Sequence, residues 1–182
     1  LLAIIIDDLP FEHIWRRWMA QSAEGVANVK MLVHAKYPDR VKSPWLRERL
    51  IPVCYKPEWG SVEITKAMLA LLTEGIRDKS TTATVPTNSV YAFVSESCVP
   101  IRPLSTFTDA VWTAGSSWID VRHKPRNGYN ASSQWCPIED SGIIPREYVC
   151  KSDQWVLLTE AHARMVLELP QKVGCTQSEI WK

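Results

Sequence analysis

The sequence has almost no net charge and no long apolar run. Its formal charge is +1 over 182 residues, which gives no support to a nucleic-acid-binding or polybasic membrane role. No apolar stretch approaches the roughly 20 residues that a membrane-spanning helix needs. The opening LLAIII is too short for the core of a signal sequence and has no basic residue before it, so we predict a first strand there.

Several motifs of nucleotide and metal chemistry are also missing. The chain contains neither GxGxxG nor GxxxxGK[ST], which excludes the usual dinucleotide fingerprint and the P-loop. No Asp-x-Asp pair follows the central apolar strand, so the usual magnesium clamp on a sugar diphosphate is absent. We therefore predict no metal site.

The cysteines show no pattern of a metal or redox site. They are scattered, with no CxxC pair and no zinc spacing, at Cys54, Cys98, Cys136, Cys150 and Cys175. Cys136 and Cys150 bracket a loop-like segment and could form a disulfide in an oxidising compartment. Asn130-Ala131-Ser132 is a glycosylation sequon, which matters only if the chain is secretory.

The composition is that of one folded domain, with 46% hydrophobic and 23% charged residues. Short apolar runs alternate with helical patterns, which predicts an α/β fold with a mainly parallel central sheet flanked by helices. The expected strands are Leu2–Ile6, Val29–His34, Leu50–Cys54, Val90–Val94, Ser117–Val121 and Gln154–Leu158. The expected helices are Pro10–Gln21, Ser61–Arg77, Leu104–Thr113 and Glu160–Leu169, the last with Thr159 as its N-cap.

Polar residues follow most of the expected strands, where open α/β sheets bind ligands. They are Asp7–Asp8, His34–Lys36, Lys56–Gly60, Ser95–Cys98 and Asp120–His123. Each of these segments also has a structural explanation that involves no ligand. The two acids before Leu9-Pro10 are more typical of a helix cap than of a metal site. His34 suits a hydrogen bond at the core edge as well as a ligand contact.

The tryptophans and the pair Ser97-Cys98 each allow a functional and a structural interpretation. Nine tryptophans are a high number for this length, and core packing is expected to account for most of them, although indoles also stack on sugar rings. Ser97 and Cys98 suggest a hydrolase nucleophile only weakly, because no GxSxG surrounds them. Neither His123 nor His162 has a spacing that ties it to Cys98 as a base.

FVSESCVPIRPLSTF, starting at Phe93, resembles the core-2/I-branching β-N-acetylglucosaminyltransferase family, especially its plant and algal members, where a strand ends in a motif like LLSESCIPL. Four further segments are similar to family elements in the same order. They are FEHIWRRWM, VKMLVHAKYP, KPEWGSVEITKAMLALLTEGIRD and KSDQWVLLTEAHARMVLE. The similarity covers nearly the whole chain.

The resemblance implies a GT-A type Rossmann-like domain that transfers a sugar with inversion, without a metal or another cofactor. The donor would be a UDP-sugar, carrying N-acetylglucosamine or xylose, and the acceptor a glycan or glycoprotein. Family members are typically type II membrane proteins of the Golgi lumen. The donor-binding residues implied here are Val33, His34, Glu58, Trp59, Gly60, Glu96, Ser97 and Cys98, and the acceptor-binding residues are Asp120 and Trp155.

An inverting transfer also needs a carboxylate that deprotonates the acceptor hydroxyl. The family takes this base from a late Asp-Glu pair, for which Glu179 is the nearby candidate. We expect the base and the phosphate-binding cations to follow Lys182 instead. Residues 1–182 would then form a single glycosyltransferase-like catalytic domain that is truncated at both ends. The rival hypothesis is an inactive carbohydrate- or nucleotide-sugar-binding module of the same fold.

Overall fold

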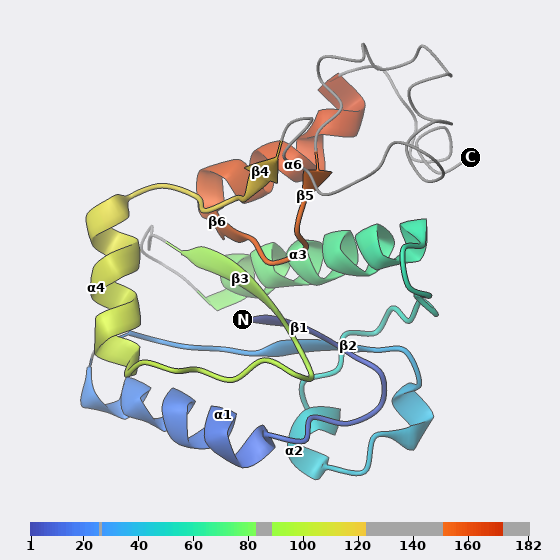
Figure 1. The fold of residues 1–182 in the computed structure, drawn as a ribbon, viewed down its shortest axis with the longest axis horizontal. Coiled ribbons are helices and arrows are strands. Elements are labelled where there is room, and N and C mark those ends of the chain that lie inside the picture. Colours follow the sequence, from blue (N-terminus) through green and yellow to red (C-terminus); the bar gives the residue numbers. More distant parts are fainter. Residues whose placement is uncertain (26, 83–88, 123–150, 173–182) are drawn as a thin grey trace. The chain divides into compact units, whose positions relative to one another are not determined.

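Three neighbouring strands of the main sheet are parallel in the computed structural model, which describes residues 1–25, 27–82, 89–122 and 151–172 (Figure 1). A fourth strand pairs antiparallel with the edge of this group. The order is β2-β1-β3-β6. These strands are β1 (Leu2–Ile5), β2 (Leu32–Ala35), β3 (Val90–Ser95) and β6 (Leu157–Thr159). The predicted Rossmann-like α/β class is confirmed.

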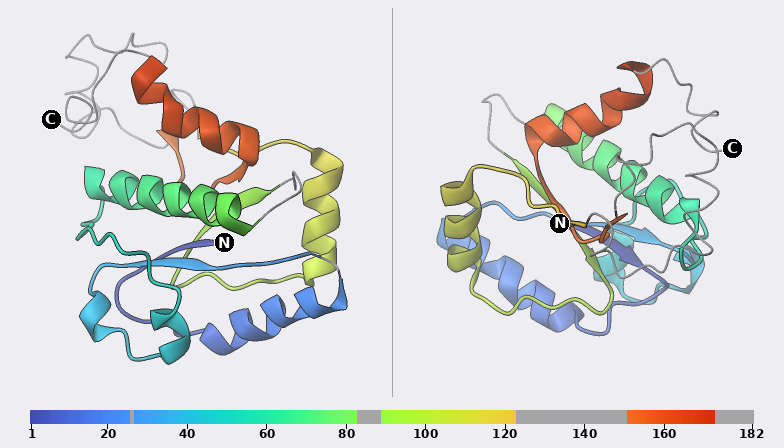
Figure 2. Two further views of the ribbon diagram at one scale, coloured as in Figure 1. Left: turned by 180° about the vertical axis from the view of Figure 1, so that it is seen from behind. Right: turned by 45° about the horizontal axis from the view of Figure 1, so that its top comes forward.

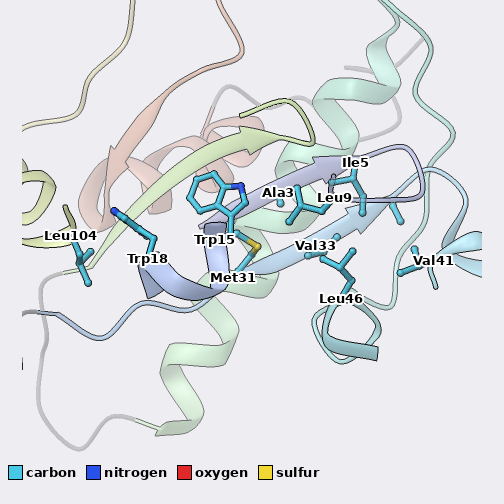
Figure 3. Packing of buried hydrophobic residues seen from close by; sticks show 11 residues of the cluster. Ala3, Ile5, Leu9, Trp15, Trp18, Met31, Val33, Val41, Leu46 and Leu104 are labelled. Carbon is cyan, nitrogen blue, oxygen red and sulfur yellow. The ribbon is translucent and has the colours of Figure 1, made fainter. Parts of the chain in front are cut away.

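Helices cover both faces of this sheet. Helix α1 (Glu12–Ala20) lies against one face, where Trp15 and Trp18 join Ala3 and Val33 in the buried core (Figure 3). Burying side chains of this size supplies much of the stabilisation of the fold. A strand presents successive side chains to opposite faces, so the neighbours of Ala3 and Val33 in sequence point toward the second helix layer.

Helix α3 (Val62–Thr82) forms that second layer. It packs close to the sheet at Gly75, where an added Cβ would lie 3.0 Å from the ring of Tyr91. Helix α6 (Glu160–Lys172) lies beside α3 (Figure 2). Thr159 caps α6 as predicted, because its Oγ1 accepts a hydrogen bond of 3.4 Å from the amide of His162.

Shorter elements connect these layers. Helix α4 (Leu104–Ala114) follows the strand β3 and adds Leu104 to the core. The other short elements are η1 (Gln21–Glu24), η2 (Pro38–Arg40) and α2 (Pro44–Arg47). The last of these was not predicted, although a Ser-Pro pair marks its start: Ser43 Oγ accepts a hydrogen bond from the amide of Leu46.

The chain divides into two compact units, residues 1–117 with 157–182 and residues 118–156. The four-stranded sheet belongs to the first. In the second, β4 (Val121–Arg122) pairs antiparallel with β5 (Lys151–Ser152). The expectation of a single domain stays a prediction. No helix among the described residues is long and apolar enough to cross a membrane.

Three predicted strands are wrong in extent. Of Leu50–Cys54 only Leu50 forms a bridge, with Val33, because the chain soon meets Pro52, which has no amide hydrogen to donate. The predicted Ser117–Val121 is reduced to β4, which starts at its last residue. The predicted Gln154–Leu158 contributes only its last two residues to β6.

Candidate functional site

The carboxyl ends of the three parallel strands form one edge of the first unit. Helix α1 connects β1 to β2 across one face, and α3 lies on the other face between β2 and β3. The sheet therefore changes its winding direction between β1 and β3. Ligands of open α/β sheets bind at such a switch point, outside the carboxyl ends of the strands. Asp7 and Asp8 follow β1 there, and Glu96 follows β3.

The polar tip at the end of β3, Ser95 to Cys98, is a closed hydrogen-bonded turn. The amide of Cys98 donates to the carbonyl oxygen of Ser95 at 3.1 Å. Ser95 Oγ lies 3.0 Å from Ser97 Oγ and 3.5 Å from Cys98 Sγ. Small polar side chains are needed here because they satisfy the backbone at the strand end, as in other Ser turns.

Helix α1 holds the segment that follows this tip. The indole of Trp15 donates to the carbonyl oxygen of Cys98 at 3.0 Å, and that of Trp18 donates to the carbonyl oxygen of Arg102 at 2.8 Å. The amide of Leu104 donates to Gln21 Oε1 at 2.8 Å. Residues three apart lie on one face of a helix, so a single face of α1, continued by its C-cap residue Gln21, fixes the whole segment. The core tryptophans thereby position the candidate site.

His34, near the end of β2, is buried with 0% of its surface exposed. Its Nε2 accepts a hydrogen bond of 2.9 Å from the amide of Tyr55, and the two rings are stacked at 6.0 Å between centroids. Burial lowers the pKa of His34 below its ordinary value. A neutral imidazole with Nε2 free to accept is the form that this hydrogen bond requires. His34 therefore fixes the backbone at Tyr55.

Lys36, directly after β2, forms a second connection to the segment that contains Tyr55 and Glu58. Its Nζ lies 2.7 Å from Glu58 Oε1, with 13% of the Lys36 side chain and 76% of the Glu58 side chain exposed. The hydrogen bond with Glu58 raises the pKa of Lys36, so the ammonium stays charged. Lys36 is thus a charged group held in one position at the carboxyl edge.

The turn after Glu58 leads into α3. The amide of Glu58 donates to Ser61 Oγ at 3.0 Å, and the amide of Ser61 donates to the carbonyl oxygen of Glu58 at 3.0 Å. Gly60 has φ +73°, a left-handed conformation that glycine adopts at no steric cost. Trp59, between them, is 86% exposed. The turn therefore presents an indole to solvent.

The expectation that packing accounts for most tryptophans is wrong for the described part of the chain. Of its seven tryptophans, Trp15 and Trp18 are buried, whereas four are more than 40% exposed. These four are Trp59, Trp112, Trp118 and Trp155. An exposed indole is an aromatic surface on which a base or sugar ring can stack.

The structure brings several predicted donor-site residues to one edge. Ile4 of β1 pairs with His34 on one side and with Ser95 on the other. These two residues are therefore two strand spacings apart, about 9–10 Å. Glu58, Trp59 and Gly60 are tied to the His34 side of this edge, and Glu96, Ser97 and Cys98 lie on the other side.

Some predicted residues have a different local role. Val33 is completely buried in the α1-side core, so its side chain offers no surface to a ligand, and the buried His34 ring contacts Tyr55 instead. The expectation that Asp7 or Asp8 caps the first helix is wrong. Asp8 Oδ1 accepts from the amide of Leu9 at 2.8 Å, whereas α1 begins at Glu12 without a side-chain cap.

The second unit holds the two predicted acceptor residues. Asp120 directly precedes β4, and Trp155 follows β5 by a few residues. Because the two strands are antiparallel, both residues lie at the same end of this ladder. Glu179, His123, Asn130, Cys136, Cys150 and Cys175 lie outside the described residues.

Sequence reasoning missed one polar cluster. Ser117 Oγ accepts from the amide of Thr159 at 2.9 Å and lies 2.7 Å from His162 Nδ1. Its only signal in the sequence was the cap residue Thr159.

In the part of the chain that the structure describes, no group of three or more His, Cys, Asp or Glu residues forms a possible metal site. The first unit is thus a Rossmann-like α/β unit with a polar, partly aromatic carboxyl edge.

This chain is similar to a glycosyltransferase. Over 174 residues it is 28% identical to a protein of rice (Oryza sativa subsp. japonica) described as glycosyltransferase BC10. The match covers 92% of this chain and 39% of the rice protein, so the chain spans about two fifths of that relative. No family model and no solved structure matches. The resemblance to plant glycosyltransferases that the five sequence motifs predicted is confirmed.

Proposed function

We propose that this chain forms the donor-binding part of a glycosyltransferase that uses a UDP-sugar. The observation that carries the proposal is the similarity over 92% of the chain to a protein described as a glycosyltransferase. The geometry supports it independently, because the polar strand ends lie at the switch point between β1 and β3, where this class of sheet binds nucleotides.

The groups at this edge suit a nucleotide sugar. Trp59 offers an exposed aromatic surface for the uracil or the sugar. Lys36 offers a fixed positive charge, held by the 2.7 Å contact with Glu58. A cation beside the diphosphate would stabilise the charge that develops on the leaving group. His34 would act as a positioning residue, since it fixes Tyr55 and the segment that carries Trp59.

The proposed reaction is an inverting transfer. The oxygen of an acceptor hydroxyl attacks the anomeric carbon, while a carboxylate takes the hydroxyl proton. The bond between that carbon and the diphosphate oxygen breaks, and UDP leaves with the electron pair. We place the carboxylate outside the described residues, where Glu179 is the candidate in this sequence. The acceptor, a glycan or glycoprotein, would meet Asp120 and Trp155.

Three finer parts of the proposal rest on the family resemblance. They are a donor that carries N-acetylglucosamine or xylose, a reaction without a metal ion, and a location in the Golgi lumen. The second can be tested with purified intact protein. UDP binding and sugar transfer are expected to be the same with and without EDTA.

Titration calorimetry of the intact protein with UDP tests the core of the proposal. Trp59→Ala is expected to weaken UDP binding by about tenfold, the size of one lost stacking interaction. Trp112→Ala, which removes another exposed indole from α4, is the matched control and should bind UDP normally. Absence of UDP binding to the wild type would refute the proposal. Binding without any transfer would favour the inactive nucleotide-sugar-binding module.

A further inference from the structure

A surface groove runs between α1 and the segment that follows the polar tip of β3, away from the strand ends. Its volume is about 300 Å³, which is near the lower limit for ligand sites. One wall is a stripe of α1 together with its C-cap residue Gln21, and the other is a run of four consecutive residues. The lining residues are Ile14, Arg17, Trp18, Gln21, Pro100, Ile101, Arg102 and Pro103.

The two walls are fixed to each other. Trp18 Nε1 donates to the carbonyl oxygen of Arg102 at 2.8 Å, and Gln21 Oε1 accepts from the amide of Leu104 at 2.8 Å. Prolines at positions 100 and 103 further limit the backbone of the second wall. The groove is therefore formed before any partner binds, which lowers the entropic cost of binding.

Two arginines give this groove a positive charge, and no described residue forms an ion pair with either of them. Arg17 and Arg102 are exposed and form no ion pair with any described residue. Arg16, the neighbour of Arg17 on α1, points to a different partner and pairs with Glu12 at 3.3 Å. An unpaired guanidinium on each wall is suited to carboxylates, which it can bind through two parallel hydrogen bonds.

The rest of the lining is apolar. Ile101 is 85% exposed at the groove, and Ile14 and the two prolines contribute further aliphatic surface. Trp18 is only 7% exposed, so it offers little aromatic face for a sugar ring to stack on. Aliphatic surface with two flanking cations fits a peptide that has apolar and acidic side chains better than it fits an acidic glycan.

We propose that this groove docks an acidic segment of a partner protein, with an apolar side chain against Ile101 and carboxylates on Arg17 and Arg102. The site is separate from the proposed donor edge and does not depend on glycosyltransferase activity.

Fluorescence polarisation of the intact protein tests this. The probe is a fluorescein-labelled peptide of alternating glutamate and leucine, and its matched control has glutamine in place of glutamate. The acidic peptide is expected to bind and the glutamine peptide is not. Arg17→Gln and Arg102→Gln are each expected to weaken binding about fivefold, the value of one exposed ion pair. Binding should also weaken as salt rises, because exposed charges are screened.

Arg16→Gln is the control variant, since it removes a neighbouring charge outside the groove. It should leave binding of the acidic peptide unchanged, and circular dichroism of all three variants checks that they fold. Three results would overturn the proposal: no binding of the acidic peptide, equal loss in Arg16→Gln and Arg17→Gln, or equal binding of the glutamine peptide. Binding of a heparin oligosaccharide but not of the peptide would assign the groove to an acidic glycan instead.

Discussion

The indole Nε1 of Trp15 donates a hydrogen bond of 3.0 Å to the carbonyl oxygen of Cys98, 83 positions away in the sequence. The same ring lies in the buried core against β1 and β2. One residue therefore couples the packing of α1 to the position of the polar turn after β3. A change in this contact should affect both stability and the candidate site.

Trp15→Phe tests this coupling. The substitution keeps an aromatic ring in the core but removes the donor for the Cys98 carbonyl, so the free energy of unfolding should fall by about 1–3 kcal/mol. Urea denaturation measures it. Trp112→Phe, at an exposed position on α4, should change stability by less than about 0.5 kcal/mol. Equal effects of the two substitutions would show that the buried hydrogen bond contributes nothing measurable.

The ion pair of Lys36 and Glu58 gives a prediction that rests on the proposed function. Lys36→Met should weaken UDP binding about tenfold, since it removes a hydrogen bond to a charged group. Glu58→Gln should strengthen UDP binding, because the carboxylate that competes for the Lys36 ammonium is gone. Titration calorimetry with intact protein measures both.

Lys56→Met is the control for this pair, because Lys56 is an exposed lysine of the same segment. It should bind UDP almost as the wild type does. If Glu58→Gln instead weakens binding as much as Lys36→Met, the ion pair serves only to hold the segment in place. That outcome would leave UDP binding by the wild type, and hence the proposed function, intact.

The buried His34 predicts how stability depends on pH. Burial lowers its pKa in the folded chain below the ordinary value of 6.5, so between these two values the unfolded chain binds more protons. The contribution of His34 to the free energy of unfolding is therefore fully present above about pH 6.5. It decreases as the pH falls from there toward the pKa of His34 in the folded state. Urea unfolding at a series of pH values measures this slope.

His34→Gln should flatten that slope, because an amide oxygen can accept from Tyr55 but does not titrate. Its stability at neutral pH should be lower than that of the wild type, since the stacking on Tyr55 is lost. His13→Gln is the control at an exposed position of α1 and should leave the slope unchanged. A wild-type slope that survives in His34→Gln would mean that other groups cause it.

Ser117→Ala should lower the free energy of unfolding by about 1–2 kcal/mol, because it removes the acceptor for the Thr159 amide. Ser116→Ala, the exposed neighbour, should have an effect below about 0.5 kcal/mol. Thermal unfolding of the two variants checks the difference. A Ser117→Ala protein as stable as Ser116→Ala would show that water replaces the hydroxyl without loss.

The elements with a strong pattern could be predicted from the sequence. The three parallel strands and the four long helices were found because apolar periodicity reports which residues face a core. Element ends were less accurate, as for α1, which begins at Glu12 and not at Pro10. The strand at Leu50–Cys54 failed because its pattern resembles a strand while Pro52 prevents the pairing.

Most of the candidate site could be predicted as a set of strand ends but not as a set of contacts. Glu58 was expected near the donor, yet nothing in the sequence indicated its ion pair with Lys36, 22 positions away. For His34, the sequence left a hydrogen bond at the core edge and a ligand contact both open, and it could not indicate that the partner of this hydrogen bond would be the amide of Tyr55. Pairs this far apart meet only when strand and helix layers have packed.

By itself, the sequence determined the Rossmann-like class and the polar residues after most of the strands, because hydrophobic periodicity and turn chemistry are local properties. Only the tertiary structure decided which of these residues share an edge and which are enclosed. Val33 became core and Trp59 became exposed, although both belong to predicted binding segments. The physical reason is that a side chain on a strand face or at the tip of a turn is buried only where another layer of the fold packs against it.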